Sequence, residues 1–434
     1  MAEDEATIAQ IAKEVAAAHS DAIRLRKRGQ PEPFTPDELR EMCPTAAARK
    51  LRKEIKHARQ YWQAALGAAS KRGAQYCSDY VLRCYIDRQQ AANAWADQRV
   101  VISERTGDIH SLRKVKDASI RARFARIYAM TRGIEDLAER DGLVPIFLTL
   151  TLSPEWHPCP VKGFESRSWT ARHGTLAPVY LQEDWRRLRA LMERHSIRVF
   201  GIRVAEPHAD GCPHLHAMLW VFDDQIDMMQ HCVRSVFLGN KQSDIKIIDK
   251  GTGGAKASSY LLKYILKSVE VETGCGVEVD DTTLRVRAQM SEMDMRRIAF
   301  GGLGGIPSIS QRVYSASPEA LHEMPERAQR AREKMDEMKW AEALEVLGAV
   351  PSDETGKLKS LYEQVVTQYG DEGKRWAGFT DTETGEVWIA PKWRIEKVDR
   401  ALGENAVAVN DNYPRGRAGA RPEPPPLSLK ATTE

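Results

Sequence analysis

Between residues 143 and 195 the hydrophobic pattern changes from that of a strand to that of a helix. Residues 143–152 are dominated by strand-forming side chains and predict a largely buried strand. Residues 180–195 have helical spacing, and the apolar positions that share one face are Leu181, Trp185, Leu188 and Leu191. We therefore expect a buried strand followed by an amphipathic helix.

The next segment predicts a hairpin. Residues 197–205 and 214–222 both have strand character, and the Asp210-Gly211 pair between them marks a tight reversal. A helix at 224–239, a short strand at 245–248 and a helix at 256–269 follow. Hairpins mixed with helices predict an α+β fold with a central, mainly antiparallel sheet flanked by helices.

The segments on either side of this core are expected to be mostly helical. Residues 1–140 are rich in Ala, Arg, Lys, Glu and Gln, which favour helices. Residues 317–402 predict helices and a hairpin at 375–393, whereas the Pro- and Gly-rich residues 403–434 predict a disordered tail. With the core at 141–316, the sequence divides into four segments.

Composition excludes several classes of protein. The chain has 434 residues, of which 42% are hydrophobic and 29% charged, and no apolar run reaches the about 18 residues of a membrane span. The acidic N-terminus is unlike a signal peptide. The seven cysteines are odd in number and form no Cys-x-x-Cys pair, which argues against a zinc ribbon and a secreted disulfide scaffold. We expect a soluble protein of a reducing cytoplasm that does not bind membranes.

The net charge of +3 is too small to indicate nucleic acid, so charge has to be examined locally. One stretch is strongly basic and is followed by Tyr61 and Trp62; its cations are Arg49, Lys50, Arg52, Lys53, Lys56 and Arg59. Basic side chains near aromatic rings suit a phosphate backbone with unstacked bases, so we expect DNA binding here. A solvated helix face is the alternative.

Two histidines on the second strand of the predicted hairpin are candidate metal ligands. His214 and His216 point to the same face of a strand, because side chains alternate there. Glu206 on the paired strand is our choice for a third ligand, and His208 and His157 are other candidates. Alone, a His-x-His pattern also fits two ordinary strand histidines.

Two tyrosines on the predicted helix at 256–269 are candidate nucleophiles. Tyr260 and Tyr264 are one turn apart, and Lys263 and Lys267 follow them at i+3. A phenol with a pKa near 10 is a poor nucleophile unless a metal polarises the phosphate it attacks and a cation stabilises developing charge. An aromatic pair at a helix surface is the alternative.

Taken in order, three motifs resemble the HUH endonuclease superfamily: Phe147-Leu148-Thr149-Leu150-Thr151, Pro213-His214-Leu215-His216-Ala217, and Tyr260-x-x-Lys263-Tyr264-x-x-Lys267. Two tyrosines on one helix resemble its two-tyrosine rolling-circle replication initiators. Three further stretches are similar to the bacteriophage replication gene A protein family: Tyr76-Cys77-Ser78-Asp79, Arg203 to His216, and Ala299 to Tyr314.

The resemblance implies a phage rolling-circle initiator that nicks one strand of the origin. It implies His214 and His216 as ligands of Mg²⁺ or Mn²⁺, Tyr260 and Tyr264 as nucleophiles that form a 5′-phosphotyrosine, and a 3′ hydroxyl left to prime synthesis. The partners would be single-stranded or supercoiled origin DNA with the helicase and DNA polymerase of a bacterial host. No Walker A motif is present, so an attached helicase is not expected.

Three alternatives remain open at this point. A transposase or plasmid initiator could use the same two-tyrosine chemistry. A non-catalytic DNA-binding module would need only the basic helices. A metallohydrolase would use the histidine pair with water as its nucleophile, and would leave the tyrosine pair unexplained.

Overall fold

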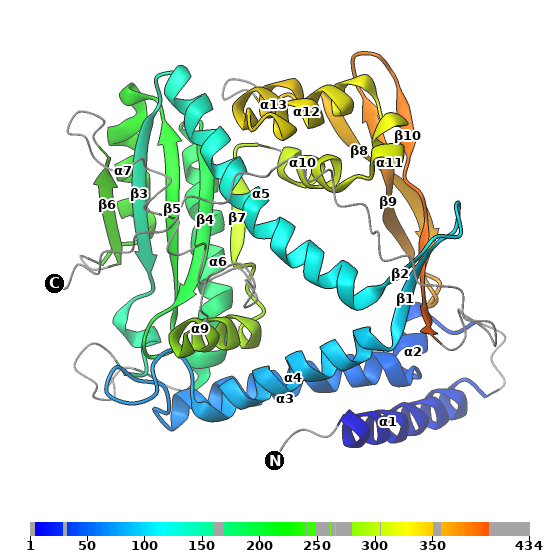
Figure 1. Ribbon diagram of the computed structural model, residues 1–434. Helices are drawn as coiled ribbons and strands as arrows, with labels where there is room; N and C mark the ends of the chain where they lie inside the picture. The colour runs from blue at the N-terminus through cyan, green and yellow to red at the C-terminus, as the bar shows by residue number, and fades with distance from the viewer. Residues whose placement is uncertain are drawn as a thin grey trace.

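The structure is a computed structural model that describes most of the chain. The described residues are 5–28, 33–159, 169, 171–239, 242–248, 261, 265, 280–303, 305–349 and 357–398. Helices and antiparallel sheets are both extensive within them, which confirms the predicted α+β class (Figure 1). The tail expected at 403–434 lies outside the described residues.

The N-terminal region begins with four helices: α1 (Glu5–Arg26), α2 (Pro36–Glu41), α3 (Pro44–Ala65) and α4 (Asp79–Asp97). A capping box starts α2, because the Thr35 hydroxyl accepts from the Glu38 N–H and the Glu38 carboxylate accepts from the Thr35 N–H. The hydroxyl of Ser78 caps α4. Further along the chain lie α6 (Ala171–Arg194) and α9 (Asp281–Glu292), and α3 packs on α6 while α4 packs on α9.

A hairpin interrupts this helical region, and the sequence pattern did not predict it. Its strands are β1 (Arg99–Ser103) and β2 (Ile109–Ser111). The helix α5 (Leu112–Arg140) follows and crosses one face of the central sheet diagonally (Figure 1). It ends where Gly142 takes φ +72° and the Leu143 N–H donates to the Ala138 carbonyl at 2.9 Å, which turns the chain into the strand β3 (Val144–Thr151).

The central sheet is antiparallel, with strand order β6-β3-β5-β4-β7. Its strands are β3 (Val144–Thr151), β4 (Phe200–Pro207), β5 (Pro213–Val221), β6 (Ser243–Ile247) and β7 (Ile298–Gly301). Every residue of β5, the central strand, is buried. The predicted strands at 143–152, 197–205, 214–222 and 245–248 are confirmed to within a few residues.

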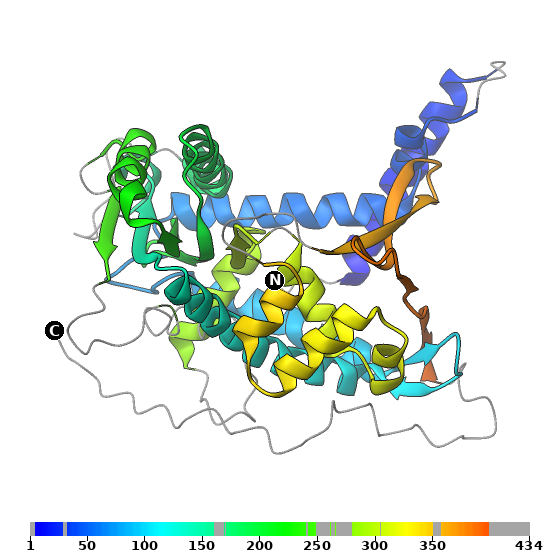
Figure 2. The ribbon, with the colours of Figure 1, turned by 90° about the horizontal axis from the view of Figure 1, so that it is seen from above.

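The two faces of this sheet carry separate apolar clusters. On the α5 face, Phe147, Met218 and Trp220 pack with α5 and with helices that follow β7. On the α6 face, Leu215 and Leu219 pack with α6 (Ala171–Arg194) and α7 (Ile226–Val236). Figure 2 shows α5 and α6 on opposite sides of the sheet. Residues of β5 therefore alternate between two interiors, so even numbers point to the α5 face and odd numbers to the α6 face.

Shorter elements connect these parts. The single-turn helices η1 (Pro154–Trp156) and η2 (Asp223–Gln225) follow β3 and β5. The helix α9 (Asp281–Glu292) lies against β4 and leads into β7.

The C-terminal region carries helices and then more strand than the sequence suggested. The helices are α10 (Ile306–Ser315), α11 (Pro318–His322), α12 (Glu326–Asp336) and α13 (Trp340–Val346). The strands are β8 (Leu358–Val366), β9 (Glu372–Asp381), β10 (Val387–Ile389) and β11 (Trp393–Lys397). The predicted hairpin corresponds to β9 and β10, whereas β11 leaves it and pairs with β1.

Two polar contacts attach the C-terminal sheet to the helices. Arg327 of α12 donates to the carboxylate of Asp381 at 2.6 Å. Burial alone would raise the pKa of Asp381, but hydrogen bonds from Arg327 and from the backbone N–H groups of residues 383 and 384 outweigh it and lower the pKa. At the other end of the sheet, the second contact joins Tyr369 to Cys43. Hydrogen bonds with Thr45 and with Tyr369 lower the pKa of the Cys43 thiol to about 7.

Within the described part of the chain, we find no helix that is long and apolar enough to span a membrane.

Candidate metal centre and nuclease site

The hairpin between β4 and β5 turns within four residues. The His208 N–H donates to the Cys212 carbonyl at 2.7 Å, and the Gly211 N–H donates to the His208 carbonyl at 2.8 Å. Gly211 has φ +84°, a conformation that costs little only without a side chain. A distant segment of the chain also stabilises the turn, because the Tyr76 N–H donates to the Ala209 carbonyl at 2.9 Å. This turn fixes the register of the strands that carry the candidate ligands.

That register places Glu206 directly opposite His214, as the sequence suggested it could. Glu206, His214 and His216 all project from the α5 face, since their numbers have the same parity on paired strands. All three are buried, and their ligand atoms lie within 4.8 Å of one another. The described part of the chain holds no other such group of three His, Cys, Asp or Glu side chains.

The donor set fits a divalent cation. The Nε2 atoms of His214 and His216 lie 2.8 Å apart. Two nitrogens bound at about 2.1 Å and at a right angle to one ion would lie roughly 3 Å apart. Two imidazoles with a carboxylate suit Mn²⁺, and also Mg²⁺ when substrate oxygens complete the shell. We therefore treat these residues as a candidate metal centre.

Neighbours on β3 orient His216. The Oγ1 of Thr149 lies 3.1 Å from its Nδ1, and the Phe147 ring stacks on the imidazole with centroids 5.7 Å apart. A hydrogen bond at Nδ1 leaves Nε2 for a metal, which is how metal-binding histidines are usually oriented. The predicted strand Phe147 to Thr151 thus lies beside the histidine strand and supports it.

The other two candidate ligands, His208 and His157, lie near this group but are not part of it. His208 lies beside His214, with ring centroids 4.0 Å apart, and its Nε2 is 2.9 Å from the Oγ1 of Thr151. His157 contacts the carboxylate of Asp210 through Nδ1 at 2.9 Å. Burial, and then the proximity of His157, lower the pKa of His208 to about 4, so His208 is neutral near pH 7.

The predicted nucleophiles Tyr260 and Tyr264, with Lys263 and Lys267, lie outside the described residues. Two of their sequence neighbours are described. Leu261 and Ile265 are helical, buried, and part of the apolar cluster on the α5 face. The helical assignment expected around 256–269 is confirmed at these two positions, and they pack on the same face as the histidines.

The basic stretch lies on α3, and part of it is engaged inside the protein. Arg59 is buried and pairs with Glu292 at 2.9 Å, and Lys56 pairs with Asp294 at 2.6 Å. Arg52 pairs with Glu5. The remaining cations, Arg49, Lys50 and Lys53, are exposed. The DNA-binding prediction remains a prediction and is best placed on these three exposed side chains.

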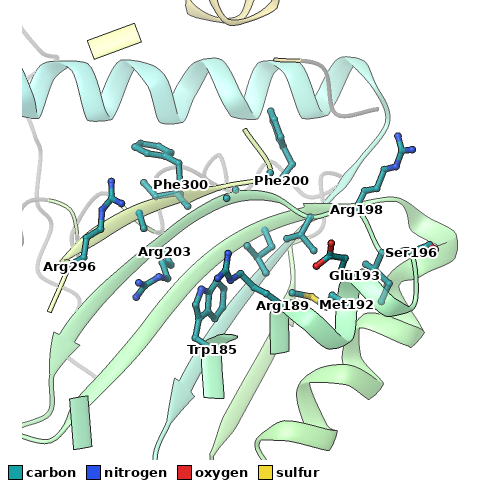
Figure 3. Close-up of a pocket in the computed structure, with 18 residues that line it drawn as sticks. Trp185, Arg189, Met192, Glu193, Ser196, Arg198, Phe200, Arg203, Arg296 and Phe300 are labelled. Atoms are coloured by element: carbon teal, nitrogen blue, oxygen red, sulfur yellow. The ribbon is translucent and has the colours of Figure 1, made fainter. Parts of the chain in front are cut away.

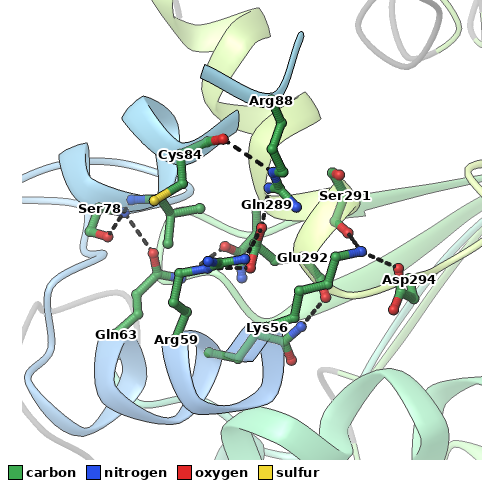
Figure 4. A network of polar contacts seen from close by, with 12 residues as sticks. Lys56, Arg59, Gln63, Ser78, Cys84, Arg88, Gln289, Ser291, Glu292 and Asp294 are labelled. Carbon is green, nitrogen blue, oxygen red and sulfur yellow. Dashed lines mark hydrogen bonds and ion pairs between the residues drawn. The ribbon is translucent and has the colours of Figure 1, made fainter. Parts of the chain in front are cut away.

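A polar network that the sequence analysis missed links α3 to the hairpin turn (Figure 4). Gln63 donates to the Gln289 side chain at 2.8 Å, and Gln289 donates to the Gly211 carbonyl at 3.1 Å. Nearby, Glu292 accepts hydrogen bonds from both Arg59 and Arg88. No local pattern marks glutamines inside helices as partners of a distant turn, so the sequence offers no signal for them.

Comparisons with known proteins indicate the family of the chain. Residues 2–272 match the family model described as bacteriophage replication gene A protein. The replication gene A protein of Escherichia phage 186 is 25% identical over 416 residues, which cover 88% of this chain and 59% of that protein. The replication protein of Haemophilus phage HP1 (strain HP1c1) is 26% identical over 314 residues, which cover 68% of this chain and 40% of that protein.

A third relative has a name that mentions an activity. The probable replication endonuclease from a prophage-like region of Salmonella typhimurium is 22% identical over 306 residues, which cover 65% of this chain and 37% of that protein. The chain spans roughly two fifths to three fifths of the length of these three relatives. No solved structure matches it. Because the family model matches more than half of the chain, the protein belongs to the bacteriophage replication gene A protein family.

Proposed function

We propose that this protein initiates phage rolling-circle replication by nicking one strand of the origin and joining itself to the 5′ phosphate through a tyrosine. The observation that carries the proposal is the buried group of Glu206, His214 and His216 on the α5 face. Leu261 and Ile265 support it, because the residues next to both tyrosines pack on that face. The name of the Salmonella relative supports an endonuclease activity.

The residues divide into a metal set and a nucleophile set. Glu206, His214 and His216 would hold Mg²⁺ or Mn²⁺, with Thr149 orienting His216. A bound divalent cation would withdraw charge from the scissile phosphate.

The nucleophile set performs the transfer. The phenolic oxygen of Tyr260 or Tyr264 bonds to phosphorus and loses its proton, the bond from phosphorus to the 3′ oxygen breaks, and the 3′ oxygen takes up a proton. Lys263 and Lys267 would stabilise the charge that develops.

A second tyrosine would allow a round of replication to be completed. After one round, the bound 5′ end has to be released while the regenerated origin is cut again. A second tyrosine one turn away can attack the new site, and the new 3′ hydroxyl can then resolve the first linkage. The ester bond conserves the energy, so no ATP is needed. The partners would be single-stranded or supercoiled origin DNA, with the helicase and polymerase in the cytoplasm of a bacterial host.

The test is incubation with origin-bearing single-stranded DNA and Mn²⁺, followed by a denaturing gel. We expect a protein–DNA adduct that resists denaturation, disappears with EDTA, and is lost in His214→Ala and His216→Ala. Cleavage without an adduct would instead indicate a metallohydrolase, and binding without cleavage would indicate a DNA-binding module.

A further inference from the structure

A pocket of about 880 Å³ opens at the edge of the sheet formed by β4 and β7 (Figure 3). Its walls come from α6, through Trp185 and Arg189, and from Arg203 on β4. Arg203 has odd parity on its strand and therefore points to the α6 face, away from Glu206. The pocket is thus distinct from the candidate metal centre, although both use β4.

Part of the open space in the pocket lies above Gly301, where the sheet carries no side chain. Gly201 of β4 pairs with Gly301 of β7, and Arg203 pairs with Ala299. A Cβ built at Gly301 would meet no atom within 4 Å, so the space above it is open. Gly302 has a different role. Its φ is +72°, and a Cβ there would lie 1.9 Å from the Val199 carbonyl oxygen, so the conformation and the close contact both require glycine.

Positive charge exceeds negative charge among the side chains that line the pocket. Four arginines line it, whereas Glu193 is the one carboxylate among its described lining residues; the arginines are Arg189, Arg198, Arg203 and Arg296. The Nη1 of Arg203 is buried and has no hydrogen-bond partner among the described residues. Burial, and then the charges of Arg189 and Arg296, lower the pKa of Arg203 to about 10. An anion placed among these guanidinium groups would relieve their repulsion.

An aromatic ring lies among these cations. The guanidinium of Arg203 is 5.7 Å from the centroid of the Trp185 ring, and Trp185, Arg189 and Arg203 lie in the same part of the pocket in Figure 3. Arginine forks match phosphate oxygens, and both tryptophan rings and guanidinium planes stack on bases. A nucleotide offers both groups in one unit, whereas an inorganic anion would leave the ring unused.

We propose that this pocket binds one nucleotide of single-stranded DNA, with its phosphate against Arg189, Arg203 and Arg296 and its base against Trp185. The inference rests on the proposed function, which supplies the DNA strand. Arg203 and Glu206 are three positions apart on β4, a span of about 10 Å. Because β7 is an outer strand of the sheet, DNA that leaves the α5 face can pass around it to the pocket.

The first test measures binding of a labelled oligothymidylate by fluorescence anisotropy. Arg203→Met removes a cation, and Gly301→Leu fills the open space without a steric conflict at its Cβ. Both should weaken binding about tenfold or more, and Arg203→Met should also reduce the slope of log affinity against log salt by about 0.7, the value for one phosphate contact on a single strand. Thermal unfolding checks that each variant is folded.

Matched controls lie on the same helix. Arg186 and Arg187 of α6 pair with Glu183 and Asp184 and do not line the pocket. Their Met variants remove the same charge from the same helix and should keep wild-type affinity and salt slope. Equal losses in control and pocket variants would show a general charge effect and overturn the proposal.

The second test locates the base. In a series of oligonucleotides with one abasic position each, wild type should lose affinity at one position by about 5- to 150-fold, the range that base–aromatic stacking gives. That loss should disappear in Trp185→Leu. Identical profiles for wild type and Trp185→Leu would refute base stacking in the pocket, and thymidine monophosphate binding as tightly as the oligonucleotide would refute a DNA site.

These outcomes are separable from those of the adduct experiment. If wild type forms the adduct but the pocket variants bind DNA normally, the pocket proposal fails and the proposed function stands. If wild type forms no adduct but the pocket variants lose DNA binding, the proposed function fails and the pocket remains a DNA site.

Discussion

The buried carboxylate of Glu292 should be among the most sensitive polar positions of the protein. Its side chain has no exposed surface, and it accepts from the Nε of Arg59 at 2.9 Å and from Arg88 (Figure 4). The side chain of Arg59 is itself only 6% exposed. In Glu292→Ala, the Arg59 cation would stay buried after losing this anion.

The magnitude follows from that burial. Removing one partner of a buried ion pair costs about 3–5 kcal/mol of unfolding free energy, because the remaining charge is uncompensated. Lys56→Met provides the control, since its partner Asp294 is 56% exposed and such pairs contribute about 0–1 kcal/mol. The double variant Arg59→Met/Glu292→Leu removes both charges and should be more stable than Glu292→Ala alone.

The assay is urea unfolding followed by both far-ultraviolet circular dichroism and tryptophan fluorescence, so that any intermediate is detected. Glu292→Ala should lower the midpoint far more than Lys56→Met does. Because α9 also carries Gln289, which donates to the hairpin turn, Mn²⁺ affinity should fall as well. Equal stability of Glu292→Ala and Lys56→Met would refute the reasoning that burial makes this pair critical.

Three further predictions concern separate parts of the molecule. Thr149→Val should leave the protein folded but weaken Mn²⁺ binding about 10–100-fold in isothermal titration calorimetry, because it removes a hydrogen bond to a ligating histidine. Unchanged affinity would show that Thr149 does not support the metal centre. At pH 7.5, iodoacetamide should label Cys43, with a pKa of about 7, much faster than Cys77, whose pKa burial raises to about 12; peptide mapping that finds Cys77 modified first would contradict this. The pKa of Asp381 is lowered in the folded protein, so its pair with Arg327 contributes its full stabilisation when the pH is above about 3.9, the pKa of an unfolded Asp, and loses it as the pH falls through the folded-state pKa. Asp381→Asn should therefore flatten the decline of the urea midpoint at acid pH. An unaltered decline would argue against the pair.

Local patterns predicted the parts of the fold whose causes are local. The strands β3, β4 and β5 follow from runs of apolar side chains with turn residues between them. The short reversal at Asp210-Gly211 placed Glu206 on the strand paired with the histidines, because a tight turn constrains register, and the structure pairs it with His214.

Long-range contacts were beyond prediction from a single sequence. Arg59 and Glu292 are 233 positions apart, so nothing near Arg59 distinguishes a buried ion-pair partner from a solvated cation. The pairing of β1 with β11 brings together Arg99 and Lys397, which are 298 positions apart. Part of the open space in the pocket lies where Gly301 has no side chain, and a sequence shows such an absence only once the strands are paired.

The most direct test of the central claim is the identity of the residue that becomes joined to DNA. The adduct formed with origin-bearing single-stranded DNA is trimmed with nuclease, digested with protease and analysed by mass spectrometry. We predict a nucleotide on Tyr260 or Tyr264, reduced adduct in each single Phe variant, and none in Tyr260→Phe/Tyr264→Phe. A linkage on any other residue, or an adduct that persists in the double variant, would contradict the account.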